Sequence, residues 1–114
     1  MLTQTPQRTY TLEEYRKSEE TAEFRSEYRD GEIVPMTGGT INHNRITRNI
    51  CTFLQFGLRG KNAEPFMSDL RLWIPRYRRG TYPDVMVISG KPVFNEGRND
   101  EVLNPILIVE VLSN

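Results

Sequence analysis

The sequence has little of what several protein classes require. Cys51 is the one cysteine among 114 residues, so an internal disulfide is excluded and a reduced, cytoplasmic protein is expected. No apolar run approaches the roughly 20 residues of a membrane-spanning helix, and the polar N-terminus lacks a signal-peptide pattern. The 15 lysines and arginines are balanced by 15 aspartates and glutamates, which argues against a surface that binds polyanions everywhere.

The first third of the chain predicts a helix and a hairpin. Thr11 and Glu14 have the spacing of a capping box, which predicts a short charged helix from residue 11 to about residue 20. Asp30-Gly31 separates two short strand candidates, and this pair accepts the positive φ angles that a tight hairpin turn needs.

The strongest helix signal covers residues 42–58, where apolar side chains recur at three- and four-residue steps, with Gly60 as the expected C-cap. The members of this stripe are Ile46, Ile50, Phe53, Leu54 and Leu58. Three strand candidates follow, at residues 69–75, 82–88 and 106–112. The first alternates, which places Leu70, Leu72 and Ile74 on one face and Arg71 and Trp73 on the other. The last one is nearly all apolar, which indicates a strand that helices cover on both faces.

Only one good amphipathic helix is available to cover that strand, although two covering layers are needed. The chain has room for one domain with one modest core. We therefore expect an incomplete domain over residues 11–114, preceded by a flexible tail over residues 1–10.

Glu110 interrupts the apolar strand candidate. Strand periodicity places it on the same face as Ile108 and Leu112. Because burying an unpaired carboxylate costs several kcal/mol, such a group is usually paired, protonated or bound to a metal. The alternative is a carboxylate at the strand end that reaches water or meets an arginine.

Asp84 is the second carboxylate of interest, because it follows Pro83 at the start of the neighbouring strand candidate. Two adjacent strands could bring Asp84 and Glu110 to the same sheet edge. Mg²⁺ takes one or two protein carboxylates and keeps several waters, so the pair could form a metal site. Taken alone, Asp84 is better explained as a turn or strand-start residue, and only its combination with Glu110 favours the metal site.

Tyr82-Pro83-Asp84 followed by Glu110-Val111 resembles the PD-(D/E)xK nuclease superfamily, and more closely its "putative restriction endonuclease" branch, which is abundant in cyanobacteria. Further matching positions are Glu27, Asp30-Gly31-Glu32-Ile33, His43, Ile46, Asn49, Asp69, Arg71 and the segment from Asn104 to Ser113. The resemblance implies an α/β, restriction-endonuclease-like core, in which a mixed sheet carries an N-terminal hairpin and one long flanking helix. The family's C-terminal helix would be missing.

The superfamily pattern has a lysine two residues after the acid, and this chain has Leu112 there. The close family is similar in this respect and carries its lysine on a helix after the last strand. The catalytic lysine is therefore expected beyond Asn114. Lys61 and Lys91 are the only lysines after residue 60, and neither has the spacing to replace it.

The resemblance also implies roles for individual carboxylates. Asp84 and Glu110 would hold Mg²⁺ or Mn²⁺, and Glu27 would assist as a third catalytic carboxylate. A solvent-facing strand residue is the alternative for Glu27. Asp69 is a weaker candidate at the start of another strand.

DNA is the expected partner, and the candidate contacts are His43, Arg71, Arg76 and Arg78. His43 lies at the start of the long helix, where backbone amides favour anions, although a polar cap is the alternative. The arginines flank the strand that leads to Asp84 and suit a phosphate backbone, unless they form an ordinary solvated turn. A homodimer is compatible with cutting both strands of a duplex.

Three functional hypotheses follow. The first is a metal-dependent DNA endonuclease of the PD-(D/E)xK type, inactive if the lysine is absent. The second is a catalytically silent, truncated remnant that acts at most as a DNA- or partner-binding α/β module. The third is a small interaction module without phosphate chemistry, in which an arginine pairs with Glu110.

Overall fold

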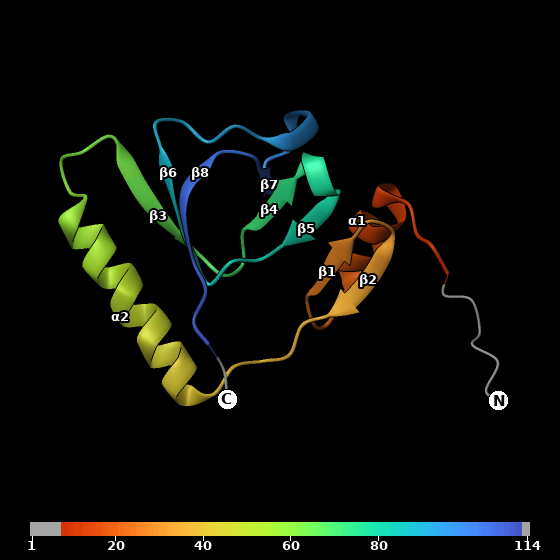
Figure 1. The fold of residues 1–114 in the computed structure, drawn as a ribbon, viewed down its shortest axis with the longest axis horizontal. Helices are drawn as coiled ribbons and strands as arrows, with labels where there is room; N and C mark the ends of the chain where they lie inside the picture. The colour runs from red at the N-terminus through yellow and green to blue at the C-terminus, as the bar shows by residue number, and fades with distance from the viewer. Residues whose placement is uncertain (1–7, 113–114) are drawn as a thin grey trace.

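The computed structural model describes residues 8–112, and its two sheets pack face to face between two helices (Figure 1). Of the expected N-terminal tail, residues 1–7 lie outside the described residues. Tyr10, by contrast, is held against the hairpin, since its amide donates to the carbonyl of Gly31 at 2.8 Å. Within the described part, no helix is long and apolar enough to cross a membrane.

Helix α1 (Leu12–Thr21) and the hairpin form as the local sequence predicts. Thr11 caps α1, and both hydrogen bonds of the capping box with Glu14 are present. Strands β1 (Ser26–Arg29) and β2 (Glu32–Pro35) are joined by Asp30 and Gly31, whose φ angles are 45° and 97°.

The larger sheet has five strands in the order β2-β1-β5-β4-β7. Its further strands are β4 (Arg71–Ile74), β5 (Arg79–Thr81) and β7 (Glu101–Val102). A short 3-10 helix (Pro75–Tyr77) connects β4 to β5. Strand β7 runs parallel to β4 while the other pairs are antiparallel, so the sheet is mixed, as predicted.

The smaller sheet is antiparallel, with the order β3-β6-β8. Its strands are β3 (Ala63–Met67), β6 (Val85–Ser89) and β8 (Pro105–Val109), and helix α2 (Ile41–Gly57) packs against β3 and β6. The helix ends at a C-cap on Leu58. The prediction of Gly60 as the cap was therefore wrong, and Gly60 instead takes a positive φ of 80° in the turn that follows.

The core has two parts, which lie on opposite faces of β4. Leu72 packs with buried residues of β6 and β7 between the two sheets. Trp73 points the other way and packs with Tyr15 and Tyr28 beneath α1. This alternation along β4 was predicted from the sequence, and it follows from the two-residue period of a strand.

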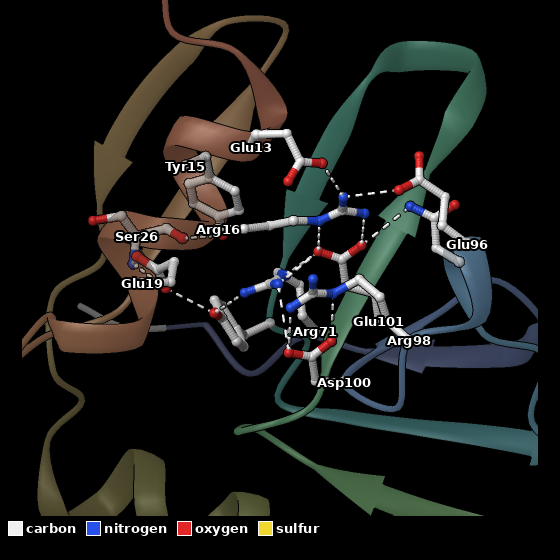
Figure 2. Close-up of polar contacts among 12 residues, drawn as sticks. Glu13, Tyr15, Arg16, Glu19, Ser26, Arg71, Glu96, Arg98, Asp100 and Glu101 are labelled. Atoms are coloured by element: carbon white, nitrogen blue, oxygen red, sulfur yellow. Dashed lines mark hydrogen bonds and ion pairs between the residues drawn. The ribbon is translucent and has the colours of Figure 1, made fainter.

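A buried charged cluster joins α1 to the five-stranded sheet (Figure 2). The fully buried Glu101 accepts hydrogen bonds from Nη2 of Arg16 and Nη2 of Arg71, both at 2.6 Å, and from Asn95 at 3.1 Å. Burial by itself raises the pKa of Glu101, but these hydrogen bonds outweigh it and hold the pKa at about 2. Arg71 also donates to the hydroxyl of Tyr82 at 3.0 Å.

The last strand differs from the prediction. Strand β8 ends at Val109, before Glu110, and it is the edge strand of the smaller sheet. Within residues 8–112 it is not covered on both faces, since Ile106 is 67% exposed and its neighbours are also accessible. Strands β3, β5 and β7 were not predicted, because they are short or interrupted by proline, glycine or charge.

Candidate functional site

The register between β6 and β8 brings Asp84 and Glu110 together. Val85 pairs with Val109 at the end of the ladder, so the next residues outward are Asp84 on one chain segment and Glu110 on the other. The amide of Val111 donates to Oδ2 of Asp84 at 2.8 Å and closes this end of the sheet. The predicted meeting of the two carboxylates at one sheet edge is therefore confirmed.

Glu110 is placed differently from the prediction. The sequence predicted it inside a buried strand, but it follows β8 and is exposed. Among the described residues, its carboxylate neither accepts a hydrogen bond nor forms an ion pair, so an arginine partner for Glu110 is also excluded within residues 8–112.

His43 is the third member of this group. Its Nε2 lies 3.2 Å from Oδ2 of Asp84, and each of the two side chains is 17% exposed. The first turn of α2 positions His43, because Thr40 caps the helix and accepts a hydrogen bond from the His43 amide. Gly39 packs against the imidazole, where a Cβ atom would lie 2.7 Å from Nδ1.

A cavity of about 300 Å³ opens beside the carboxylates. Its walls include Asp84, Glu110 and His43, together with the loop at residues 36–39 and Arg25. The loop joins the hairpin to α2. The cavity is therefore lined by segments that flank the larger sheet, by the end of the smaller sheet and by the first turns of α2. This convergence could not be inferred from any one segment of the sequence.

The electrostatics of the cavity favour a cation. Burial raises the pKa of Glu110, and the negative charges of Asp84 and Glu27 raise it further, while His43 partly opposes them. A divalent cation between the carboxylates would relieve this repulsion. Among the described residues, no three histidine, cysteine, aspartate or glutamate side chains are grouped as a metal-binding set.

Glu27 is near this site but is engaged elsewhere. Its carboxylate accepts hydrogen bonds from Thr81 and from Nη2 of Arg29, the latter at 2.7 Å. Burial raises the pKa of Glu27, but these hydrogen bonds lower it overall. Its charge affects Glu110, although it does not line the cavity.

The arginines singled out in the sequence lie away from the acid pair. Arg71 is buried against Glu101, so its guanidinium is not accessible to a phosphate. Arg76 and Arg78 are in the turn that precedes β5, whereas Asp84 follows the other end of that strand. Arg78 is paired with Asp30 at the tip of the hairpin.

Asp69 lies outside the cavity of the acid pair, whereas Arg25 lies on its wall. Asp69 precedes β4 and lines a separate, smaller cavity. Arg25, which the sequence did not single out, lines the cavity that contains the acid pair. In the sequence, Arg25 directly precedes the hairpin strand that carries Glu27. Only the folded chain shows that it lines the same cavity as Asp84.

The fold and the site define an α/β protein with paired carboxylates at a sheet edge, beside a solvent-open cavity. Residues 12–114 match the family model of Uma2, which is described as "Putative restriction endonuclease". The chain belongs to this family, and the predicted family is thereby confirmed.

Two proteins of Synechocystis sp. (strain ATCC 27184 / PCC 6803 / Kazusa) are similar in sequence. "Uncharacterized protein sll1609" is 45% identical over 103 residues, which are 90% of this chain and 58% of that protein. "Uncharacterized protein slr1290" is 36% identical over 101 residues, which are 89% of this chain and 52% of that protein. The chain thus spans little more than half the length of these curated relatives.

A solved structure shares the fold. It is described as a putative nuclease belonging to DUF820 from Anabaena variabilis ATCC 29413, and it matches with a TM-score of 0.71 at 24% sequence identity. The match covers 90% of this chain and 58% of that one. The predicted α/β fold class is confirmed by this likeness.

Proposed function

We propose that this chain carries the acid pair of a metal-dependent DNA endonuclease of the PD-(D/E)xK type. The observation that carries the proposal is the juxtaposition of Asp84 and Glu110, fixed by the β6–β8 register and by the Val111 amide. Membership of a family described as "Putative restriction endonuclease" supports phosphodiester hydrolysis in DNA as the reaction.

The residues present fit Mg²⁺ or Mn²⁺. Two carboxylates are the number that Mg²⁺ commonly takes from a protein, with water and substrate phosphate filling the other positions. The raised pKa of Glu110, caused first by burial and then by the neighbouring carboxylates, supports the same assignment. When bound, such an ion would activate a water and stabilise charge on the transferring phosphoryl group.

Each residue then has a defined part. His43 and the Val111 amide both contact Oδ2 of Asp84, which restricts the rotation of that carboxylate. Glu110, exposed and without a hydrogen-bond partner among the described residues, is available to the ion or to its waters. Glu27 contributes negative charge from behind, held by Thr81 and Arg29.

A catalytically silent DNA-binding module is the second candidate. The observation that favours it is the make-up of the cavity wall, where no lysine occurs among the described residues. A cation close to the attacking water normally stabilises developing charge. On this alternative the acid pair still binds the ion, while hydrolysis is absent.

A titration with Mn²⁺ tests both candidates. The variants are Glu110→Gln, Asp84→Asn and, as a control, Glu32→Gln, which removes an exposed carboxylate at the hairpin turn. Free Mn²⁺ is followed by electron paramagnetic resonance, and the melting temperature is measured in parallel. At an ion concentration 100 times Kd, the wild type gains about 2.7 kcal/mol of stability.

The wild type and Glu32→Gln are expected to bind Mn²⁺, while both acid-pair variants lose binding and the gain in melting temperature. Failure of the wild type to bind at millimolar Mn²⁺ would refute both candidates. Cleavage of supercoiled plasmid in Mg²⁺ or Mn²⁺ separates the two. Binding of the ion without cleavage would identify the silent module.

A further inference from the structure

Arg25 is the only lysine or arginine among the described residues that line the cavity of the acid pair. Although exposed, it is held in place from two sides. Its guanidinium lies 5.3 Å from the centre of the Tyr82 ring, and its Nη1 donates to the carbonyl of Ser68. Tyr82 is itself buried, and its hydroxyl donates to Glu19 at 2.7 Å. Arg25 is therefore a positive charge held on the wall of the cavity that also contains the two carboxylates.

A second cavity, of about 200 Å³, adjoins the first. The two share Arg25 and the first residues of the loop that joins the hairpin to α2, residues 36–38. The outer wall of the second cavity is formed by Glu23 and Phe24. Gly38 leaves the shared wall open, because a Cβ atom there would meet nothing within 4 Å.

Phe24 is 72% exposed in the turn between α1 and β1. A phenylalanine with so much accessible surface is available to an external partner. Arg25 lies between this ring and the acid pair, since it lines both cavities. Along the surface, the guanidinium of Arg25 thus lies between the carboxylates of the acid pair and the ring of Phe24.

We propose that Arg25 and Phe24 form a nucleotide subsite for a DNA strand with unpaired bases, next to the phosphodiester held at the acid pair. This inference rests on the proposed nuclease function and specifies the substrate class. Arg25 contacts the phosphate that flanks the bond to be cleaved, and Phe24 stacks on the adjoining base.

The chemistry of each side chain fits its part. A guanidinium is planar and presents several N–H donors, which match the oxygens of a phosphate. An aromatic ring stacks on any base, without sequence preference. A base inside a duplex already stacks on its neighbours, so Phe24 favours an unpaired one. The carboxylate of Glu23 repels phosphate and confines it to the side of Arg25.

The chain offers a matched pair of control residues. Arg59 lies 4.6 Å from the centre of the Phe56 ring at the C-terminal end of α2, away from both cavities. Phe56 is 69% exposed, close to the value for Phe24. Arg59→Gln and Phe56→Ala therefore remove the same charge and the same ring as Arg25→Gln and Phe24→Ala.

Binding is measured by fluorescence anisotropy, with a labelled 12-nucleotide single strand and the duplex of the same sequence, in Ca²⁺ and across a series of salt concentrations. Wild type is expected to bind the single strand more tightly than the blunt duplex. Arg25→Gln should lower the slope of log K against log salt by about 0.7, the value for one phosphate contact with a single strand. Phe24→Ala should weaken single-strand binding by about 5- to 150-fold.

Arg25→Lys provides a check on folding, because it keeps the charge and should preserve the salt slope. The two control variants should match wild type in affinity and slope. Equal effects of Arg25→Gln and Arg59→Gln, or of Phe24→Ala and Phe56→Ala, would overturn the subsite. Tighter binding of the duplex by wild type would overturn it as well.

Failure of the subsite is distinguishable from failure of the nuclease proposal. If wild type binds Mn²⁺ through the acid pair but the Arg25 and Phe24 variants behave like their controls, only the subsite is refuted. If wild type binds neither Mn²⁺ nor either oligonucleotide, both proposals are refuted.

Discussion

Replacing Glu101 with glutamine tests the buried cluster that ties α1 to the larger sheet. Two arginines, Arg16 and Arg71, share this fully buried carboxylate through hydrogen bonds of 2.6 to 3.0 Å. The substitution keeps the size of the side chain but removes its charge. The two buried guanidinium groups then lose their one buried counter-ion and keep only the exposed carboxylates of Glu13, Glu96 and Asp100. Removing one partner of a buried ion pair typically costs about 3–5 kcal/mol.

The pKa of Glu101 gives a second route to the same magnitude. A fall in pKa from the ordinary value of 4.5 to about 2 corresponds to about 3 kcal/mol of folding stability at neutral pH. Because the folded pKa is the lower one, this stability is present above pH 4.5 and is lost as the pH falls through 2. The penalty of Glu101→Gln should therefore shrink from about 3 kcal/mol at pH 7 to about 1 kcal/mol at pH 3.

Urea unfolding followed by the fluorescence of Trp73 measures this penalty, since that buried residue is the only tryptophan and packs in the aromatic part of the core. Glu96→Gln is the matched control, because Glu96 also pairs with Arg16, at 2.9 Å, but from an exposed position. An exposed pair contributes at most about 1 kcal/mol. A cost for Glu101→Gln no larger than that of Glu96→Gln, or one independent of pH, would refute the reasoning.

Further predictions concern the acid pair and its surroundings. His43→Ala should weaken Mn²⁺ binding severalfold, because it releases the Asp84 carboxylate. His43→Gln should restore most of the affinity, since its amide nitrogen reaches about as far as Nε2. Equal affinities for the two variants would argue against a positioning role for His43. Gly39→Ala should weaken Mn²⁺ binding in the same way, because its Cβ atom would displace the imidazole, while Gly38→Ala should leave the affinity unchanged. Tyr82→Phe removes a hydroxyl that makes one buried hydrogen bond, with Arg71, and one partly buried hydrogen bond, with Glu19. The substitution should lower the free energy of unfolding in urea by about 1.5–3 kcal/mol, and an unchanged midpoint would contradict this.

Local signals in the sequence predicted the elements whose formation depends on neighbouring residues. The capping box at Thr11, the Asp-Gly turn of the hairpin and the alternation along β4 are all set within a few positions of the chain. The pairing of Asp84 with Glu110 was also predictable, because both border strongly apolar strands that pair as neighbours. The capping box, the turn and the alternation need no information from distant residues, whereas the pairing of Asp84 with Glu110 needs only that the two strands be neighbours.

Other features were predicted wrongly from the sequence or not predicted at all, because they depend on contacts between distant residues. Arg71 lies on a strand beside other arginines in the sequence, and only the fold shows that Glu101, 30 positions later, buries it. Glu101 itself lies in a polar segment that gave no sign of a core position. The local sequence pattern does not show which charged residues become counter-ions of each other in the folded protein.

The sequence by itself determined the family, the α/β class and the identity of the two carboxylates, since these depend on residue type and on spacing along strands. The tertiary structure alone decided which side chains surround them. It brings His43 from α2 and Arg25 from the turn before β1 to one cavity. It also turns Arg71 inward and leaves β8 at an edge among the described residues. The physical reason is that strand register and packing between layers, rather than local propensity, fix distances between segments that lie far apart in the chain.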